Sequence, residues 1–112
     1  MSAETVVQAH LDAYNQRDLD AFLATCHPDV ELFRPPAAEP VLSGREAVGI
    51  HYERERFRLE GLHAELLGRL VMGSTVVDHE RVHGVGPVPT EAVLVFQVED
   101  ERIRRIWAYP AR

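Results

Sequence analysis

The sequence predicts an α+β fold, and three observations support this prediction. The first part of the chain carries apolar residues at helical spacing. From Leu62 onward, apolar and polar residues alternate with a period of two. The length of 112 residues suggests a single domain over residues 1–112, with no room for a second. Helices followed by a run of antiparallel strands describe an α+β domain.

Two helices are predicted at the start of the chain. Residues 3–17 are amphipathic, and Asp18 is a good N-cap for a second helix within residues 16–26. Pro28 ends that helix, since it disfavours helical geometry at the residue before it. Cys26 lies on the apolar side of the second helix, so we expect a small core residue rather than a nucleophile.

A strand, a loop and a helix are predicted in the middle of the chain. The stretch "VELF", residues 30–33, reads as a short strand, and the proline-rich residues 34–40 form an irregular loop. Ser43 or Gly44 opens a third helix with a charged tail, and Gly61 breaks it.

Four strands are predicted in the second half of the chain. Turn signals separate them at "MGS", "GVGPVP" and "EDE". The predicted strands cover residues 62–71, 74–84, 90–100 and 102–110.

Composition narrows the class of protein. The formal net charge of −6 does not favour binding to nucleic acid or to an anionic membrane. Cys26 is the only cysteine, so no intrachain disulfide forms, which fits a reducing compartment. The N-terminus has no signal-peptide pattern, and no segment approaches the roughly 18 apolar residues of a membrane span. We therefore expect a cytoplasmic protein.

No cofactor or metal is expected. A metal site needs three or four clustered ligands, and His79 and His83 lie about 13 Å apart on an extended strand. The stretch "GVGPVP" is a turn between strands, not a phosphate-binding loop that opens a helix.

Three stretches carry a resemblance to a known family: "LDAYNQRDLDAFLATCHPDVEL", "LSGREAVGIHY" and "RIRRIWAY". Their order resembles the superfamily of nuclear transport factor 2, ketosteroid isomerase and SnoaL-like polyketide cyclases. The resemblance implies a cone-shaped, curved mixed or antiparallel sheet wrapped by about three N-terminal helices, a cystatin-like α+β roll. It also implies a mostly apolar pocket and an outer sheet face that often forms dimers. Function transfers less, because this fold hosts isomerases, cyclases, epoxide hydrolases and non-catalytic binders.

The ketosteroid isomerase branch is matched at only one polar pocket position. Where those enzymes carry a carboxylate base this sequence has Arg34, and where they carry an acidic oxyanion donor it has Leu94. His10 replaces a tyrosine donor, whereas Tyr52 matches a helper tyrosine. Since arginine stays protonated, it cannot abstract a proton, and that isomerase mechanism is not expected.

The epoxide hydrolase branch resembles the chain at "ERVH". Those enzymes carry an arginine and, two residues on, an aspartate, where this sequence has Arg81 and His83. Their second aspartate corresponds to Ala108, so both carboxylates are gone. His83 could replace one of them as a base, because the pKa of histidine lies near neutrality.

The stretch "HERVHG" raises the question of which strand face lines the pocket. Val77, His79, Arg81 and His83 share one face by alternation, and we expect this face to look into the cone. The candidate catalytic residues are then His10, Arg81 and His83. The candidate ligand-binding residues are Tyr14, Arg34, Tyr52, Leu94, Phe96 and Ala108.

Structural alternatives remain open for the charged candidates. Arg81 could instead form a salt bridge with Glu65 on the neighbouring strand. His79 and His83 could be rim residues, and His10 could be a satisfied core histidine. Arg34 could be exposed in its loop rather than lining the pocket.

Two functions from different classes are compatible with these features. The first is a protein that binds a small, largely apolar molecule with one polar or anionic group, with isomerase, cyclase or hydrolase activity left open. The second is a non-catalytic dimerisation or protein-binding module. Trp107 and Tyr109 point to the outer sheet face, where aromatic residues are typical of interfaces, so a homodimer through this face is expected.

Overall fold

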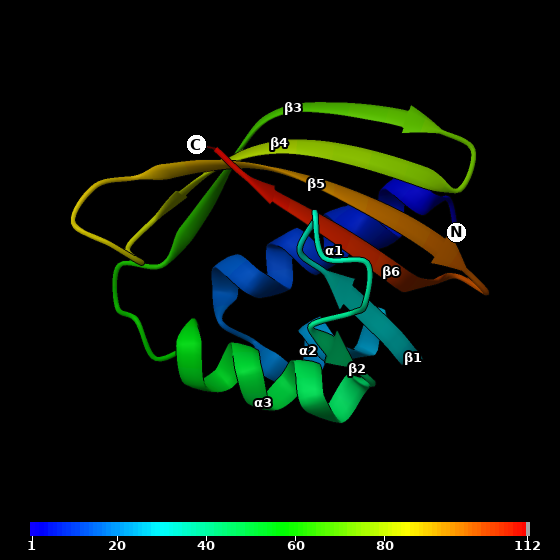
Figure 1. Cartoon of the computed structure of the whole chain (residues 1–112), viewed down its shortest axis with the longest axis horizontal. Helices are drawn as coiled ribbons and strands as arrows, with labels where there is room; N and C mark the ends of the chain where they lie inside the picture. Colours follow the sequence, from blue (N-terminus) through cyan, green and yellow to red (C-terminus); the bar gives the residue numbers. More distant parts are fainter. Residues whose placement is uncertain (112) are drawn as a thin grey trace.

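The α+β prediction is confirmed by the computed structural model, which describes residues 1–111. Three helices precede or interrupt a curved six-stranded sheet that does not close (Figure 1). The helices are α1 (Ala3–Gln16), α2 (Leu19–Ala24) and α3 (Arg45–Glu55). The strands are β1 (Cys26–Phe33), β2 (Leu42–Ser43), β3 (His63–Met72), β4 (Thr75–His83), β5 (Thr90–Glu99) and β6 (Arg102–Pro110). None of the helices within residues 1–111 is long and apolar enough to cross a bilayer.

The sheet is mixed, with the strand order β2-β1-β6-β5-β4-β3. The last four strands form an antiparallel meander, whereas β1 runs parallel to β6. This parallel pairing places the strand after α2 beside the last strand of the chain. The N-terminal and C-terminal parts of the sequence therefore build one sheet.

The start of β1 differs from the sequence prediction. The second helix ends at Ala24, and the strand begins at Cys26 rather than at Val30. Cys26 pairs with Ile103 on β6, and the register then shifts before Glu31. The irregular segment accommodates Pro28, because proline is tolerated at a bulge. Cys26 is fully buried, and burial raises the pKa of its thiol to about 11, which fits the predicted core role.

The core lies between the inner face of the sheet and the three helices (Figure 1). Phe22 is its aromatic centre, 1% exposed, with its ring 4.0 Å from that of His10. Tyr14, Tyr52 and Phe57 also contact the Phe22 ring. The rest of the core includes Val6, Val7, Val30, Leu32, Val48, Val76, Phe96, Ile103 and Ile106.

A bulge in β3 decides which way Arg69 points. The register shifts between Leu66 and Gly68, so one extra residue separates the two halves of the strand. Without it, alternation would place Arg69 on the same face as Glu65. With it, Arg69 lies opposite Asp78 on the inner face of the sheet.

Arg69 and Asp78 form a buried ion pair with two hydrogen bonds. Arg69 donates from Nε to Oδ1 at 2.7 Å and from Nη2 to Oδ2 at 3.0 Å. Arg69 Nη1 also donates to Gln8 on α1 at 2.8 Å. The aspartate has no exposed surface, so this fork replaces the water that its charge has lost.

We predict that Arg69→Leu lowers the free energy of unfolding by about 3–5 kcal/mol, because it leaves the Asp78 charge buried and unpaired. Arg81→Leu is the matched control, since Arg81 faces Glu65 across the same two strands, where the side chains are 39% and 45% exposed. It is expected to cost under about 1 kcal/mol. Urea unfolding measures both, and equal losses would contradict the prediction.

Candidate functional site

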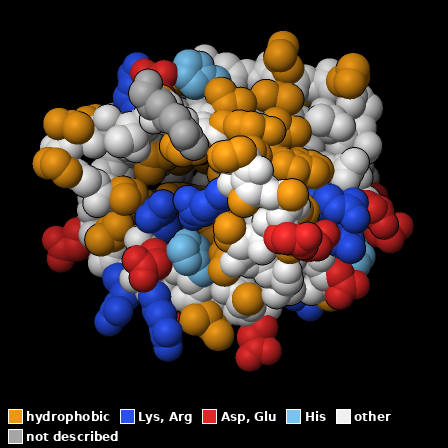
Figure 2. All heavy atoms as spheres, viewed as in Figure 1, with side chains coloured by type: hydrophobic (Ala, Val, Ile, Leu, Met, Phe, Trp, Pro, Cys, Tyr) orange, Lys and Arg blue, Asp and Glu red, His pale blue; other side chains and the backbone are white. Residues whose placement is uncertain are grey.

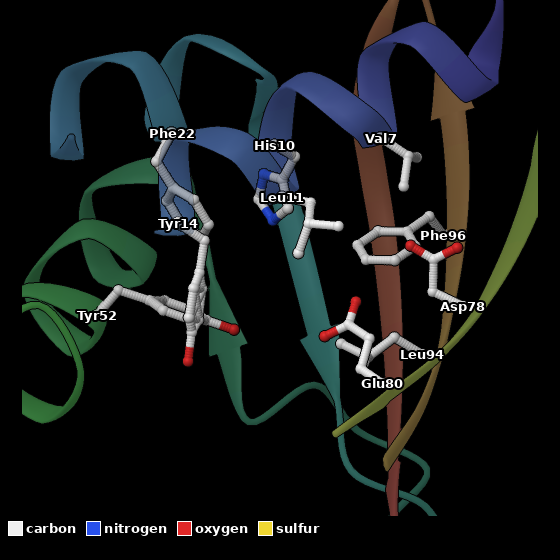
Figure 3. Close-up of a pocket in the computed structure, with 10 residues that line it drawn as sticks. All are labelled: Val7, His10, Leu11, Tyr14, Phe22, Tyr52, Asp78, Glu80, Leu94 and Phe96. Atoms are coloured by element: carbon white, nitrogen blue, oxygen red, sulfur yellow. The ribbon is translucent and has the colours of Figure 1, made fainter. Parts of the chain in front are cut away.

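The inner face of β4 carries two carboxylates, Asp78 and Glu80. The strand pairs Val76 with Phe96 and Asp78 with Leu94, both on the inner side of β5. Asp78 and Glu80 are 0% and 7% exposed. Figure 3 shows both side chains projecting from β4 into the space between the sheet and α1.

The predicted orientation of "HERVHG" is therefore wrong. Arg81 and His83 lie on the outer face, since they alternate with the buried carboxylates. Arg81 lies 3.6 Å from Glu65 and 3.5 Å from Glu91. His83 Nε2 lies 3.2 Å from Glu65, and His79 Nε2 lies 2.6 Å from Glu91. The structure therefore matches the alternative in which Arg81 forms a salt bridge with Glu65, although both side chains are partly exposed.

Two cavities meet at Glu80. The inner one has a volume of about 40 Å³ and is closed mainly by apolar and aromatic side chains. Figure 3 shows the residues around it: Val7, His10, Leu11, Tyr14, Phe22, Tyr52, Asp78, Glu80, Leu94 and Phe96. We call it the inner chamber.

The second cavity, the mouth, has a volume of about 160 Å³. Tyr14, Tyr52, Glu80 and Leu94 line both the mouth and the inner chamber. The mouth also contains Leu32, Arg34, Arg56, Val82, Ala92 and Ala108. Even together, the two cavities fall below the roughly 300 Å³ at which pockets for drug-sized molecules begin. The site therefore suits a molecule much smaller than a polycyclic one.

Two guanidinium groups, those of Arg34 and Arg56, line the mouth together with the carboxylates of Glu80 and Glu91. Neither Arg34 nor Arg56 forms an ion pair with an acid within residues 1–111. Figure 2 shows basic side chains beside a hollow between α3 and the sheet. Unpaired guanidinium groups at a pocket entrance favour a ligand with an anionic group.

Glu80 is the group with the most perturbed acid–base chemistry in the site. Burial raises the pKa of its carboxyl to about 7, and the Asp78 charge adds to this, while Arg69 acts in the opposite direction. Its carboxyl oxygens have no hydrogen-bond partner within the described chain. Every fully enclosed polar side-chain atom in residues 1–111 has such a partner, so the Glu80 oxygens are not fully enclosed. The carboxyl therefore borders the cavity, where a ligand or water can reach it.

Tyr14 and Tyr52 bring hydroxyl groups to the same place from α1 and α3 (Figure 3). Burial raises the pKa of both phenols, and the Arg56 guanidinium partly offsets this. Both tyrosines therefore remain protonated near neutral pH and can donate a hydrogen bond into the cavity.

His10 lines the inner chamber as a neutral imidazole. Burial lowers its pKa to about 3, and a hydrogen bond involving Phe22 only partly opposes this. Its Nδ1 lies 2.7 Å from Thr25 Oγ1, and its ring stacks on Phe22. A group with so low a pKa is a poor general base at neutral pH.

The structure brings most of the sequence-predicted site residues together. The inner chamber is lined by His10, Tyr14, Tyr52, Leu94 and Phe96, and the mouth by Arg34 and Ala108. Arg81 and His83 are the two that it places elsewhere. Sequence reasoning missed Asp78 and Glu80, although their alternation between Val76 and Val82 was a signal that this face is the buried one.

The curved, unclosed sheet and the helices that cover its inner face define a cone-type α+β domain. Residues 7–106 match the SnoaL-like domain family, so the chain belongs to that family. This confirms the superfamily that the three sequence stretches indicated. The sequence has no significant match among curated proteins.

Solved structures with the same fold are similar over nearly the whole chain. A SnoaL-like protein of unknown function from Burkholderia thailandensis is 26% identical, with a TM-score of 0.81 and coverage of 98% of this chain and 94% of that one. A candidate polyketide cyclase from Sinorhizobium meliloti is 25% identical, with a TM-score of 0.80 and coverage of 93% of each chain. A candidate ketosteroid isomerase from Kribbella flavida is 17% identical, with a TM-score of 0.85 and coverage of 98% and 78%, and shows the fold alone.

Glu80 and His10 make opposite contributions to the pH dependence of stability. The pKa of Glu80 rises from 4.5 to about 7 on folding, so its contribution is fully present below about pH 4.5 and is lost as the pH rises through 7. The pKa of His10 falls from 6.5 to about 3, so its contribution is present above pH 6.5 and is lost as the pH falls through 3. The two effects overlap in the wild-type protein.

A comparison of variants separates them. We predict that the free energy of unfolding of the wild type, relative to Glu80→Gln, falls by on the order of 3 kcal/mol between pH 4.5 and pH 7. Urea unfolding at a series of pH values measures the difference, and Glu65→Gln on the outer face controls for the amide substitution itself. A constant difference across this window would contradict the assignment of the raised pKa to Glu80.

Proposed function

We propose that the protein is an enzyme that moves a proton on a small, largely apolar carbonyl compound with an anionic group. The observation that carries the proposal is the Glu80 carboxyl, buried at the junction of the inner chamber and the mouth without a protein partner. A group titrating near 7 is suited to both accepting and returning a proton at neutral pH. Isomerisation and cyclisation both proceed through such a transfer.

The residues divide the chemistry between them. The ionised Glu80 takes a proton from the carbon next to the carbonyl, and the electron pair of the broken C–H bond forms an enolate. Tyr14 or Tyr52 donates a hydrogen bond to the enolate oxygen, where negative charge develops. The protonated Glu80 then returns its proton to the same carbon or, where a C=C bond is conjugated with the enolate, to the far carbon of that bond, and either transfer regenerates the carboxylate.

Arg34 and Arg56 account for the anionic group of the substrate. Both line the mouth rather than the inner chamber, so they would hold a carboxylate or similar group while the apolar part extends toward Glu80. Leu32, Leu94 and Ala108 supply apolar surface along this path. The small volume of the cavities favours a substrate of a few carbon atoms beyond its charged group.

We predict that the wild type accelerates exchange of α-hydrogens for deuterium in at least one member of a panel of short keto acids. Glu80→Gln is expected to slow this exchange by about 10²- to 10⁴-fold, because it removes the general base. Proton NMR in heavy water measures the rate.

Two outer-face variants serve as controls for this experiment. Glu65→Gln makes the same chemical change outside the cavity. Arg81→Ala tests Arg81, which the sequence analysis named as a candidate catalytic residue. Both are expected to keep the wild-type rate. Loss of exchange in Arg81→Ala with retention in Glu80→Gln would contradict the proposal.

The narrow inner chamber favours a second candidate function, a non-catalytic module of the same fold. Four aromatic side chains, those of Tyr14, Phe22, Tyr52 and Phe57, fill much of the interior with the protein's own atoms. Native mass spectrometry distinguishes the two candidates. A small molecule lost on denaturation supports the ligand-binding function, whereas a protein without an adduct or any α-exchange favours the module.

We also propose a homodimer through the outer face of the sheet. Pairing registers align an apolar row across it, formed by Leu70, Val77, Val95, Trp107 and Phe33. The rings of Trp107 and Phe33 are stacked, with 5.3 Å between their centroids. Val93 and Tyr109 lie beside this row, and they are 37% and 44% exposed. A continuous apolar surface with aromatic residues is typical of an interface.

We predict that sedimentation at micromolar concentration gives a dimer mass for the wild type and a monomer mass for Val93→Arg, because a buried arginine without a partner opposes association. Ile50→Arg is the matched control, since Ile50 is 47% exposed and lies on α3 rather than on the outer face of the sheet. A monomeric wild type would remove the proposal.

A further inference from the structure

The hydrogen bonds around His10 fix which of its ring nitrogens carries the proton. Thr25 has one hydroxyl hydrogen, and its Oγ1 lies 2.6 Å from the carbonyl oxygen of Phe22, which can only accept. The Thr25 hydroxyl therefore donates its hydrogen to the Phe22 carbonyl, and its oxygen accepts a hydrogen bond from His10. Since His10 Nδ1 lies 2.7 Å from this oxygen, Nδ1 carries the hydrogen.

The other ring nitrogen is consequently a bare acceptor. Nε2 has no hydrogen-bond partner within residues 1–111. Every fully enclosed polar side-chain atom in this range has a partner, so Nε2 is not fully enclosed. Because His10 lines the inner chamber, Nε2 is open to that chamber (Figure 3). Burial holds the pKa of His10 at about 3, so Nε2 stays unprotonated at neutral pH.

We propose that His10 is a specificity-determining residue whose Nε2 accepts a hydrogen bond from an uncharged hydroxyl group at the inner end of the ligand. This inference rests on the proposed function and deepens it, because it names a hydroxylated substrate class. A carbonyl oxygen at this position would face another acceptor and lose its own hydration, which costs free energy. A charged ammonium group at this position would lose its hydration beside the Phe22 and Phe96 rings that pack against His10.

The orienting hydroxyl of Thr25 gives the proposal a test that needs no ligand. We expect ¹⁵N NMR of the histidine side chains to show His10 protonated at Nδ1 alone in the wild type at neutral pH. Thr25→Ser keeps the hydroxyl and is expected to keep this tautomer. Thr25→Val removes the acceptor and is expected to populate the Nε2-protonated form. A wild type protonated at Nε2 would overturn the proposal.

Ligand preference provides the second readout. The probes are short straight-chain carboxylates that end in a secondary alcohol, each matched by the methyl ketone of the same length. Their carboxylate suits Arg34 and Arg56, and the chain-length series allows the terminal group to reach His10. We expect the best alcohol to bind roughly 2- to 10-fold more tightly than its ketone to the wild type and to Thr25→Ser, but not to Thr25→Val.

Titration calorimetry on the purified full chain measures these affinities. Equal or tighter binding of the ketones to the wild type, or no binding by any alcohol in the series, would overturn the proposal. Its failure is distinguishable from failure of the proposed function, because neither tautomer nor affinity depends on turnover. Conversely, unchanged deuterium exchange in Glu80→Gln would remove the proton-transfer function and leave the His10 measurements standing.

Discussion

A carboxylate without exposed surface needs a cation and directed hydrogen bonds in place of the water that it has lost. Asp78 meets this condition by accepting two hydrogen bonds from Arg69, whose guanidinium group also donates a hydrogen bond to Gln8 on α1. The pair fixes the position of α1 over the sheet. Burial, together with the negative charge of Asp78, raises the pKa of Glu80 to about 7, while Arg69 acts in the opposite direction. The acid–base property of the cavity thus depends on a neighbour that is itself held by an arginine.

The polar groups in the cavity are few, and each has a defined hydrogen-bonding character. Tyr14 and Tyr52 donate, His10 accepts, and Glu80 does either according to its protonation. Asp78 is already bonded to Arg69, and the rest of the inner chamber is apolar and aromatic. Such a distribution discriminates between ligands through the placement of donors and acceptors rather than through total contact area, since an unmatched buried polar group costs more than an added contact gains.

The sequence was sufficient for the fold because its signals are local and agree with one another. Helical spacing before residue 60, alternation after it and the cap at Asp18 indicate the three helices and the four long strands β3, β4, β5 and β6, whereas the two-residue strand β2 was not predicted. The pocket positions Leu94 on β5 and Ala108 on β6 came from the resemblance to the superfamily, and alternation placed Phe96 on the same face as Leu94. The inner face of β4 could not be identified from the sequence, because that strand carries ionisable residues on both faces. Arg69, which pairs with Asp78 on β4, changes face at the bulge in β3. A single extra residue leaves no reliable mark in the sequence pattern.

The same bulge has a consequence for the solution behaviour of the protein. β3 is the last strand of an open sheet, so one side of its backbone has no neighbouring strand. A long, regular strand in this position is a template for pairing with another chain. The irregularity at Leu66–Gly68 interrupts the ladder near its middle, and the Asn15 side chain bonds both the N–H and the carbonyl of Ala64 near its start. An exposed edge with apolar side chains at Leu70 and Met72 is thereby made a poor seed for intermolecular sheets.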